Sequence, residues 1–171
     1  MIGKKFIYVK DMYKEEIKSI FSGMLIGLCA DINNRVGGIC GAFLFSIGLL
    51  TICMLELSLF TGKVGSSNNI KELITTFVLN IFGAIIMRVL FAFNNMFVLG
   101  IGCGMLMQIG VTAYKKNFPI LTIMCVMAFI LAGYKHCIAY VYNSLDIINF
   151  VLIVLGNIVG AKICYYGGIK L

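Results

Sequence analysis

Long apolar stretches follow one another from about residue 17 to the end of this chain, with only short polar turns between them. A helix that crosses the hydrocarbon core of a bilayer takes about 20 apolar residues, because each residue advances it by about 1.5 Å. The chain after Lys18 has room for roughly six such helices. We expect spans at residues 17–32, 37–62, 72–92, 95–114, 118–143 and 146–167.

The composition places the protein in a membrane and leaves no segment for a soluble domain. Apolar residues (AVILMFWYC) make up 61% of the 171 residues and charged residues only 12%, which a water-soluble core of this size does not require. We expect a basic N-terminal tail, residues 1–18, and a single six-helix transmembrane domain, residues 19–171. The tail has no short apolar core followed by small residues, so we expect no removable signal peptide.

The positive charges predict the orientation of the chain. If the N-terminus is inside, nearly every lysine falls on the cytoplasmic side, where membrane proteins concentrate Lys and Arg. An even number of spans then returns the C-terminus to the same side. We therefore expect a multi-pass protein of the cell membrane with both termini cytoplasmic. This placement accounts for the net charge of +7 without a nucleic-acid partner.

The expected second and fifth spans contain residues that interrupt a helix. The second span contains Glu56 and then a polar run, Ser58–Lys63, and the fifth contains Gly133–His136. Interruptions at matching places in two three-span halves are typical of an inverted repeat whose broken helices meet near the midplane. Non-helical backbone there must be buried in protein or line a cavity, which predicts a pore. The alternative is that the fifth span is one tilted helix of about 25 residues, from which Lys135 reaches the membrane surface.

His136 is the only histidine of the chain and lies in an apolar stretch beside Lys135. Imidazole and ammonium groups are unfavourable at membrane depth, so this pair indicates a binding or conduction site. The seven cysteines occur singly, without a CxxC pair or a histidine at ligand spacing, and we expect them to be small buried residues rather than metal ligands or disulfides. Cys137 beside His136 suggests a nucleophile, but no carboxylate that could orient the pair is in sight. We expect no enzymatic activity and no bound metal or cofactor.

Two motifs at the expected interruptions resemble those of the formate/nitrite transporter family. Residues Leu59–Gly62 (LFTG) are similar to the family's ELFTGN loop, and Gly133–Ala139 (GYKHCIA) to its GFEHSIAN loop. The likeness continues beyond both loops. Gly37–Leu49 resembles the family's second helix, Phe118–Phe129 the first half of its fifth, and Leu155–Gly160 its last, where GNIxG is usual. The chain resembles a short, divergent member of the family over nearly everything after the N-terminal tail.

This resemblance implies an all-α integral membrane fold, aquaporin-like, with six transmembrane helices arranged as an inverted repeat of two three-helix halves and with helices 2 and 5 broken. It also implies a homopentamer in the lipid membrane, each protomer a channel for small monovalent anions such as formate, nitrite, hydrosulfide or a short carboxylate. Carried over by position, His136 would be the central histidine of the pathway and Thr61 the hydroxyl that faces it. The apolar constrictions would be Phe45, Leu49, Leu59, Phe60 and Phe129.

The chain departs from the family pattern at several polar positions. Ser58 replaces the acidic residue before LFT, Lys63 replaces the asparagine after the Thr-Gly pair, and Lys135 replaces the acidic residue before the histidine. Gly104 takes the place of a common asparagine in the fourth helix, and Arg88 stands near a pathway lysine of many members. Lys135, Lys63 and Arg88 would concentrate anions at the mouths of the pathway, an effect that weakens with salt.

A bare anion in a dry constriction is unfavourable by many kcal/mol, so we expect weak acids to cross in their neutral, protonated form. His136 is the expected proton partner, because only imidazole normally titrates between about pH 5 and 8. Two other classes of protein stay open. One is the substrate-binding six-helix membrane subunit of an energy-coupled importer, which the short outer turns disfavour. The other is a self-associating relative of the family that no longer transports, which the altered polar positions favour.

Overall fold

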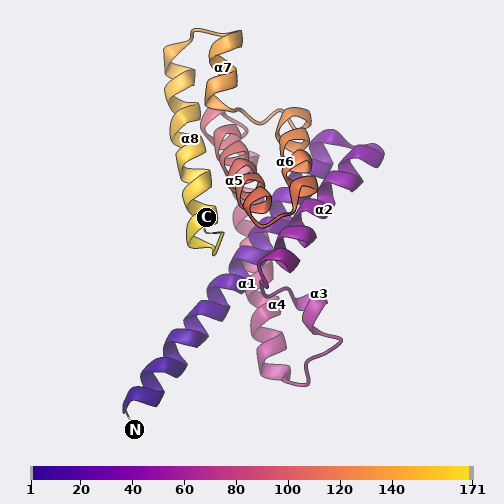
Figure 1. Cartoon of the computed structure of the whole chain (residues 1–171), viewed down its shortest axis with the longest axis vertical. Coiled ribbons are helices and arrows are strands. Elements are labelled where there is room, and N and C mark those ends of the chain that lie inside the picture. The colour runs from indigo at the N-terminus through magenta and orange to yellow at the C-terminus, as the bar shows by residue number, and fades with distance from the viewer. Residues whose placement is uncertain (1, 170–171) are drawn as a thin grey trace.

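The computed structural model describes the backbone of residues 2–169 and the side chains of residues 14–169, and this part of the chain is helical with no strand. Figure 1 shows the arrangement of its helices, which are α1 (Ile2–Val36), α2 (Gly38–Met54), α3 (Phe60–Lys63), α4 (Ile70–Ala92), α5 (Met96–Lys115), α6 (Pro119–Leu131), α7 (Cys137–Asn143) and α8 (Ile147–Tyr166). Helices α4, α5 and α8 are long and apolar enough to cross a membrane, and α2 and α6 are shorter apolar helices. The protein therefore has the helical, apolar character of a membrane protein.

Helices α4, α5 and α8 begin where the sequence supplies capping residues. The side chains of Asn69, Asn95 and Asp146 each accept a hydrogen bond from a backbone N–H three residues later, at the starts of α4, α5 and α8. Pro119 stands in the first turn of α6, where its missing N–H is harmless. These boundaries agree with the expected spans to within about two residues. The difference is in α1, a single helix that continues without a break through the expected boundary between tail and first span at residue 18.

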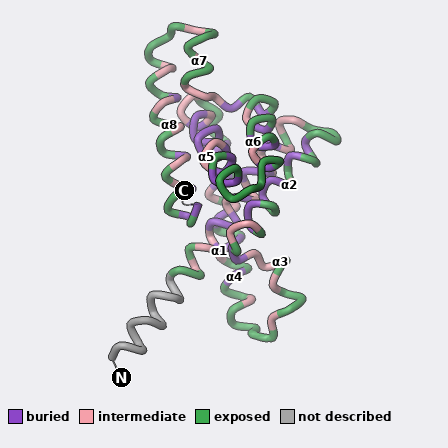
Figure 2. Tube along the Cα trace, in the orientation of Figure 1, coloured by how far each residue is buried: buried purple, intermediate pink, exposed green. Residues whose placement is uncertain are grey.

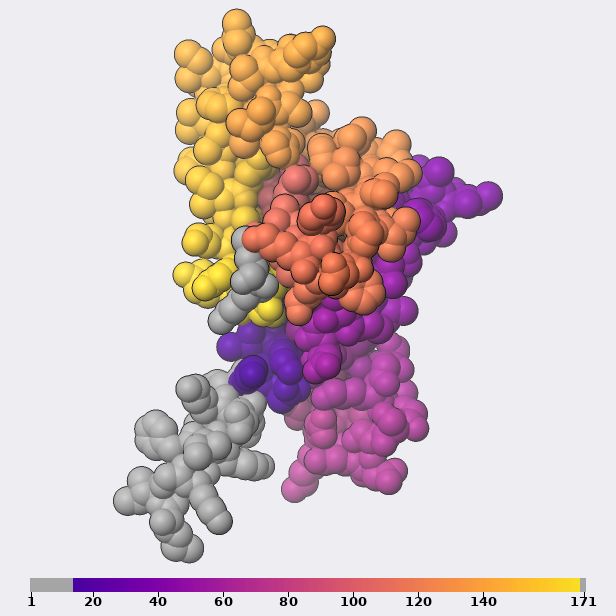
Figure 3. Space-filling model, viewed as in Figure 1, coloured from indigo at the N-terminus to yellow at the C-terminus, as the bar shows by residue number. Residues whose placement is uncertain are grey.

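The helices pack as two similar groups, α1–α4 and α5–α8. In each group the first helix packs along the fourth and also against the second, so α1 contacts α4 and α2, while α5 contacts α8 and α6. Helices α2 and α6 contact each other and join the groups. The short helices α3 and α7 lie at opposite ends of the molecule (Figure 1), and Figure 3 shows both regions projecting from the main body.

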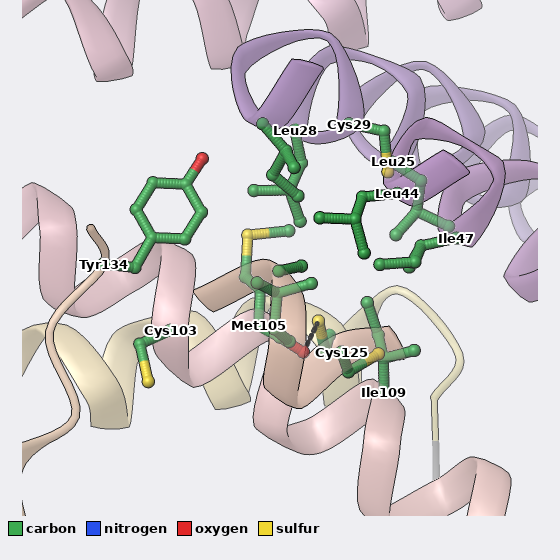
Figure 4. Packing of buried hydrophobic residues seen from close by; sticks show 14 of the residues in the cluster. Leu25, Leu28, Cys29, Leu44, Ile47, Cys103, Met105, Ile109, Cys125 and Tyr134 are labelled. Carbon is green, nitrogen blue, oxygen red and sulfur yellow. Dashed lines mark hydrogen bonds between the residues drawn. The ribbon is translucent and has the colours of Figure 1, made fainter. Parts of the chain in front are cut away.

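Burial divides the helices into a central one and two peripheral ones. Helix α5 is mostly buried, whereas α4 and α8 direct most of their apolar side chains outward (Figure 2). Such an outward apolar surface is normal for helices that face lipid or a neighbouring chain. The buried centre is aliphatic and comes from α1, α2 and α5 together with α6 (Figure 4). Its members include Leu25, Leu28, Leu44, Ile47, Met105, Ile109 and Cys125.

Glycines allow the long helices to approach at backbone distance. A Cβ atom added at Gly83 would lie 2.0 Å from the carbonyl oxygen of Ile20, and one added at Gly160 would lie 2.1 Å from that of Ile101. Small residues of this kind are what tight helix pairing in membranes uses. The pairs α1 with α4 and α5 with α8 therefore share the same close contact.

The cysteines only partly follow the expectation that they are buried. Four of them are buried, Cys137 is half-buried, and Cys40 and Cys53 are exposed. Both exposed residues lie on α2, a helix that also exposes the large apolar side chains of Phe43 and Leu50. A thiol is apolar enough for such a surface, so burial in protein was the wrong expectation for these two positions.

Candidate functional site

The first break separates α2 from α3 at residues 55–59. The chain turns at Glu56, whose φ of 52° lies in the left-handed region that few residues with a side chain adopt. Leu57 follows and its N–H donates to the carbonyl of Ile52 at 3.0 Å. This turn ends α2 and directs the chain into the LFTG segment of α3.

The second break separates α6 from α7 at residues 132–136. The chain turns at Gly133, φ 75°, which is the position 77 residues after Glu56 (56 to 133). The N–H of Lys135 donates to the carbonyl of Leu99 in α5 at 3.2 Å, and His136 is the last residue before α7. Both interruptions expected from the sequence are therefore present, and the alternative of one unbroken helix over residues 118–143 is wrong.

Asn80 of α4 holds the first break with its side-chain amide. Its Nδ2 donates to the carbonyl of Ser58 at 3.0 Å and to that of Ser19 in α1 at 2.7 Å. Its Oδ1 accepts from the N–H of Phe60 at 2.8 Å, at the start of α3. The amide thus supplies the partners that the interrupted backbone lacks, which matters because an unpaired buried N–H or C=O is strongly unfavourable.

Asn157 of α8 holds the second break in the same way. Its Nδ2 donates to the carbonyl of Lys135 at 2.8 Å and to that of Gly100 in α5 at 2.9 Å. Its Oδ1 accepts from the N–H of Cys137 at 2.9 Å, at the start of α7. The partners in the breaks are again 77 positions after those of the first group (58 to 135, 60 to 137, 80 to 157). The two breaks are therefore built to one plan.

Both asparagines lie against glycines of the neighbouring long helix. A Cβ atom at Gly23 of α1 would lie 1.9 Å from the carbonyl oxygen of Asn80, and one at Gly104 of α5 would lie 2.2 Å from that of Asn157. No larger residue fits at either place without separating the helices. This contact explains why position 104 is a glycine in this chain.

A groove of about 420 Å³ lies beside the first break. Its lining contains five of the residues predicted for the pathway, namely Phe45, Leu49, Leu59, Phe60 and Thr61. The remaining lining comes from α1 and α4, and the ring of Phe77 in α4 packs against that of Phe60 with centroids 4.9 Å apart. The groove is therefore mostly apolar, with the hydroxyl of Thr61 among its few polar groups.

His136 and Phe129 form a separate pair at the second break. Their ring centroids are 5.9 Å apart, and both side chains are half-buried. Neither residue lines the groove beside the first break. The structure thus brings together the predicted constriction residues of the first group. It places Phe129, the predicted constriction residue of the second group, beside the predicted histidine. Thr61 and His136 share no hydrogen bond within the described residues.

Arg88 lines a second cavity, of about 530 Å³, between α1 and α4. This cavity also contains Asp31 and Asn34, and it shares Ile26 and Ala84 with the groove beside the first break. The two hollows are therefore neighbours along one face of the α1 and α4 pair. Lys135 lies at the other break, where its side chain has no ion-pair partner among the described residues.

Lys63 is held by carboxylates. Its Nζ lies 2.9 Å from Glu72 Oε1 and 3.7 Å from Glu15 Oε2, and Glu15 also accepts a hydrogen bond from Ser58 at 2.7 Å. Burial raises the pKa of Glu15, and the hydrogen bonds from Lys18 and Ser58 lower it. Together with the charges of Lys18 and Lys63, these hydrogen bonds bring the pKa below its ordinary value. The network links α1 to the first break and to α3. Because two carboxylates offset its charge, Lys63 should attract anions more weakly than the sequence predicted.

Sequence reasoning missed the residues that hold the breaks. Asn80 was not recognised, and Asn157 was noted only as part of a GNIxG motif. A signal was available, because an amide in an apolar stretch needs hydrogen-bond partners from neighbouring segments, and each asparagine follows the start of a half-helix by 20 positions (60 to 80, 137 to 157). Tyr134 and Asp31, which also meet at the second break, gave no such signal.

The described fold has the helical, apolar character of a membrane protein, with one break between α2 and α3 and another between α6 and α7. No family model matches the chain, and no curated protein or solved structure is significantly similar to it. Membership of the formate/nitrite transporter family is therefore a proposal, and it rests on the motifs around Thr61 and His136 and on the matched breaks.

Proposed function

We propose that the protein is a membrane channel for small monovalent weak-acid anions, of the formate/nitrite transporter type. In this proposal the chain crosses the membrane six times. Helices α1, α4, α5 and α8 each form one span, and the other two spans are the broken pairs α2 with α3 and α6 with α7. The two groups of helices form an aquaporin-like inverted repeat, and both termini are cytoplasmic. The position of α3 and α7 at opposite ends of the molecule (Figure 1) supports this arrangement, because equivalent half-helices of an inverted repeat run to opposite faces.

The observation that carries the proposal is the matched pair of breaks held by Asn80 and Asn157. Continuous helices satisfy their own backbone in lipid and need no buried amides. Here each interruption is held by two side-chain hydrogen bonds from one asparagine, which makes a third bond to a neighbouring helix. Such support indicates that the non-helical segments have a function. In membrane proteins that function is usually a site or path for a small solute.

The residues at the breaks suggest how a weak acid crosses. Arg88 and Lys135 attract the anion towards the pathway. Transfer of the bare anion past Leu59 and Phe60 is unfavourable by many kcal/mol. In the proposed mechanism the imidazolium of His136 gives its proton to the anion, the neutral acid crosses the apolar constriction, and the neutral imidazole takes a new proton from solution. The groove beside Thr61 and the His136 pair are then parts of one route.

The outward apolar faces of α4 and α8 support an assembly in the membrane. Their exposed residues include Val78, Phe82, Ile85, Ile148, Leu155 and Ile158. We propose that lipid covers part of this surface and that neighbouring copies cover the rest in a homopentamer. The pathway of each copy lies within its own chain in this arrangement.

Flux in liposomes that contain only the purified protein tests the proposal. We expect formate, nitrite or hydrosulfide to equilibrate faster than in empty liposomes between pH 5 and 8, with formate uptake rising as the pH falls. His136→Ala should reduce the rate about tenfold or more, because a proton donor at a reacting group contributes at least that factor. Asn143→Ala, at an exposed position of α7, is the matched control and should conduct as the wild type does.

Two results would contradict the proposal. One is a rate equal to that of empty liposomes for all three anions at every pH. The other is conduction that His136→Ala leaves unchanged.

A further inference from the structure

Tyr134 joins the second break to helices of the first group. It lies within residues 132–136 and is only 4% exposed. Its hydroxyl donates to Oδ2 of Asp31 in α1 at 2.7 Å, and its ring stacks on that of Phe91 in α4 with centroids 5.4 Å apart. A segment of the second group is therefore held by two helices of the first.

Arg35 and Gly102 complete the surroundings of this ring. The Nε of Arg35 donates to the same carboxylate oxygen of Asp31, and its Cζ lies 5.5 Å from the ring centroid of Tyr134. On the side of α5 a Cβ atom at Gly102 would lie 2.9 Å from three ring atoms, so a glycine is needed there. Figure 4 shows Tyr134 at the edge of the buried cluster, with Leu28 and Cys103 nearby. The tyrosine is thus enclosed by α1, α4 and α5.

The first break has no equivalent of this contact. The position 77 residues before Tyr134 is Leu57, which has no hydroxyl (57 to 134). The position that corresponds to Phe91 is Gly168 (91 to 168), which has no ring to stack on. The tyrosine and carboxylate therefore belong only to the break that bears His136.

We propose that Tyr134 and Asp31 are positioning residues for His136. Their hydrogen bond holds residues 133–136 against α1 and so determines where the imidazole stands relative to Phe129. The consequence for transport rests on the proposed function. The structural part of the inference, that this bond holds residues 133–136 against α1, rests on the contacts alone.

The rate at which Cys137 is alkylated measures directly how firmly the second break is held. Cys137 follows His136 and is half-buried, Cys40 and Cys53 are exposed, and the other four cysteines are buried. In a Cys40→Ser, Cys53→Ser parent, N-ethylmaleimide therefore reports on this break. Tyr134→Phe keeps the ring and removes the donor, whereas Asp31→Ala removes the acceptor. Loss of a hydrogen bond to a charged acceptor should raise the alkylation rate by about fivefold or more in both variants.

Two further variants separate positioning from a general loss of stability. Asp31→Asn keeps an oxygen that accepts from the hydroxyl, so its rate should stay within about twofold of the parent. Tyr142→Phe deletes a hydroxyl at an exposed position of α7 and should also match the parent. Formate flux should fall in Tyr134→Phe and in Asp31→Ala, and it should be retained in Asp31→Asn.

The outcomes distinguish this inference from the proposed function. Alkylation in Tyr134→Phe and Asp31→Ala at the rate of Tyr142→Phe would overturn the positioning role, whatever the flux. A parent protein that conducts no anion would contradict the proposed function, and the alkylation rates would still decide whether the bond holds the break.

Discussion

Each break in the helices depends on one asparagine side chain that reaches two carbonyl groups and one N–H. Only an amide combines two donors and an acceptor on so short a side chain. Alanine lacks all three groups, aspartate lacks the donors, and glutamine is one carbon too long for the same three partners. Asn80 and Asn157 are therefore the positions at which we expect the least tolerance to change in the membrane-embedded part of the chain.

Asn157→Ala should lower stability strongly. The change leaves the carbonyl of Lys135 and the N–H of Cys137 without their partner, and each buried unsatisfied group costs about 1–3 kcal/mol. When the detergent-solubilised protein is heated and then analysed by gel filtration, the temperature at which half of the folded protein is lost should be lower than for the wild type. Asn143→Ala, whose amide makes one exposed bond to Ala139, should leave the midpoint unchanged. Equal midpoints for Asn157→Ala and Asn143→Ala would show that the amide does not hold the break.

Lys135→Glu should slow anion uptake. The variant replaces a cation beside His136 by an anion, which lowers the local concentration of small anions. We expect a reduction of several-fold in initial formate uptake at low ionic strength, with Lys135→Gln between the two. Because salt screens such effects over about 10 Å at 0.1 M, the difference should shrink as salt is added. A difference that stays constant over a wide range of ionic strength would contradict an electrostatic role.

Among the elements, the broken helices were predictable and their supports were not. Glu56 and Gly133 stand where polar or flexible residues interrupt an apolar stretch, so the breaks could be located from the sequence. The supports come from α4 and α8, 20 positions further on, and only the fold shows that Asn80 and Asn157 reach the breaks. The same holds for Tyr134 and Asp31, which are 103 positions apart and belong to different groups of helices.

Gly104→Ala should separate α5 from α8. The new Cβ atom would lie 2.2 Å from the carbonyl oxygen of Asn157, a backbone atom that cannot move aside alone. We expect a loss of stability typical of overpacking, about 1–3 kcal/mol, seen as a lower thermal midpoint. Alkylation of Cys137 should be faster, because the same displacement moves Asn157 away from the second break. Gly65→Ala is the matched control, since nothing lies within 4 Å of its Cβ position. A Gly104→Ala protein as stable as Gly65→Ala would contradict the close pairing of these helices.

The charged network around Glu15 should make the contact between α1 and α3 sensitive to acid. Its pKa is lower in the folded protein than in the unfolded chain, so the carboxylate stabilises the fold above its unfolded pKa, and this contribution is lost as the pH falls through the folded value. The half-exposed position makes the effect small. The thermal midpoint of the wild type should exceed that of Glu15→Gln at pH 7 and approach it below about pH 4. A difference that grows as the pH falls would have the wrong sign.

At the scale of the whole molecule, two groups of four helices repeat one plan and differ in the residues that occupy equivalent places. Leu59 in the first break corresponds to His136 in the second (59 to 136), and Leu57 corresponds to Tyr134. The membrane character and most helix limits could be predicted from apolar length and capping residues. The hollow beside the first break and the separate position of His136 could not, because they depend on how α1, α2 and α4 pack.

The central claim is that both breaks border one water-accessible route through the protein. Single cysteines at position 61 or 136, in a background without Cys40, Cys53 and Cys137, can be treated in proteoliposomes with a small charged thiol reagent from either side. Phe82→Cys, on the outward apolar face of α4, is the control. We predict that Thr61→Cys and His136→Cys react with the reagent and that excess formate slows both reactions, whereas Phe82→Cys reacts slowly and is indifferent to formate. Reaction at position 136 no faster than at position 82 would contradict the account.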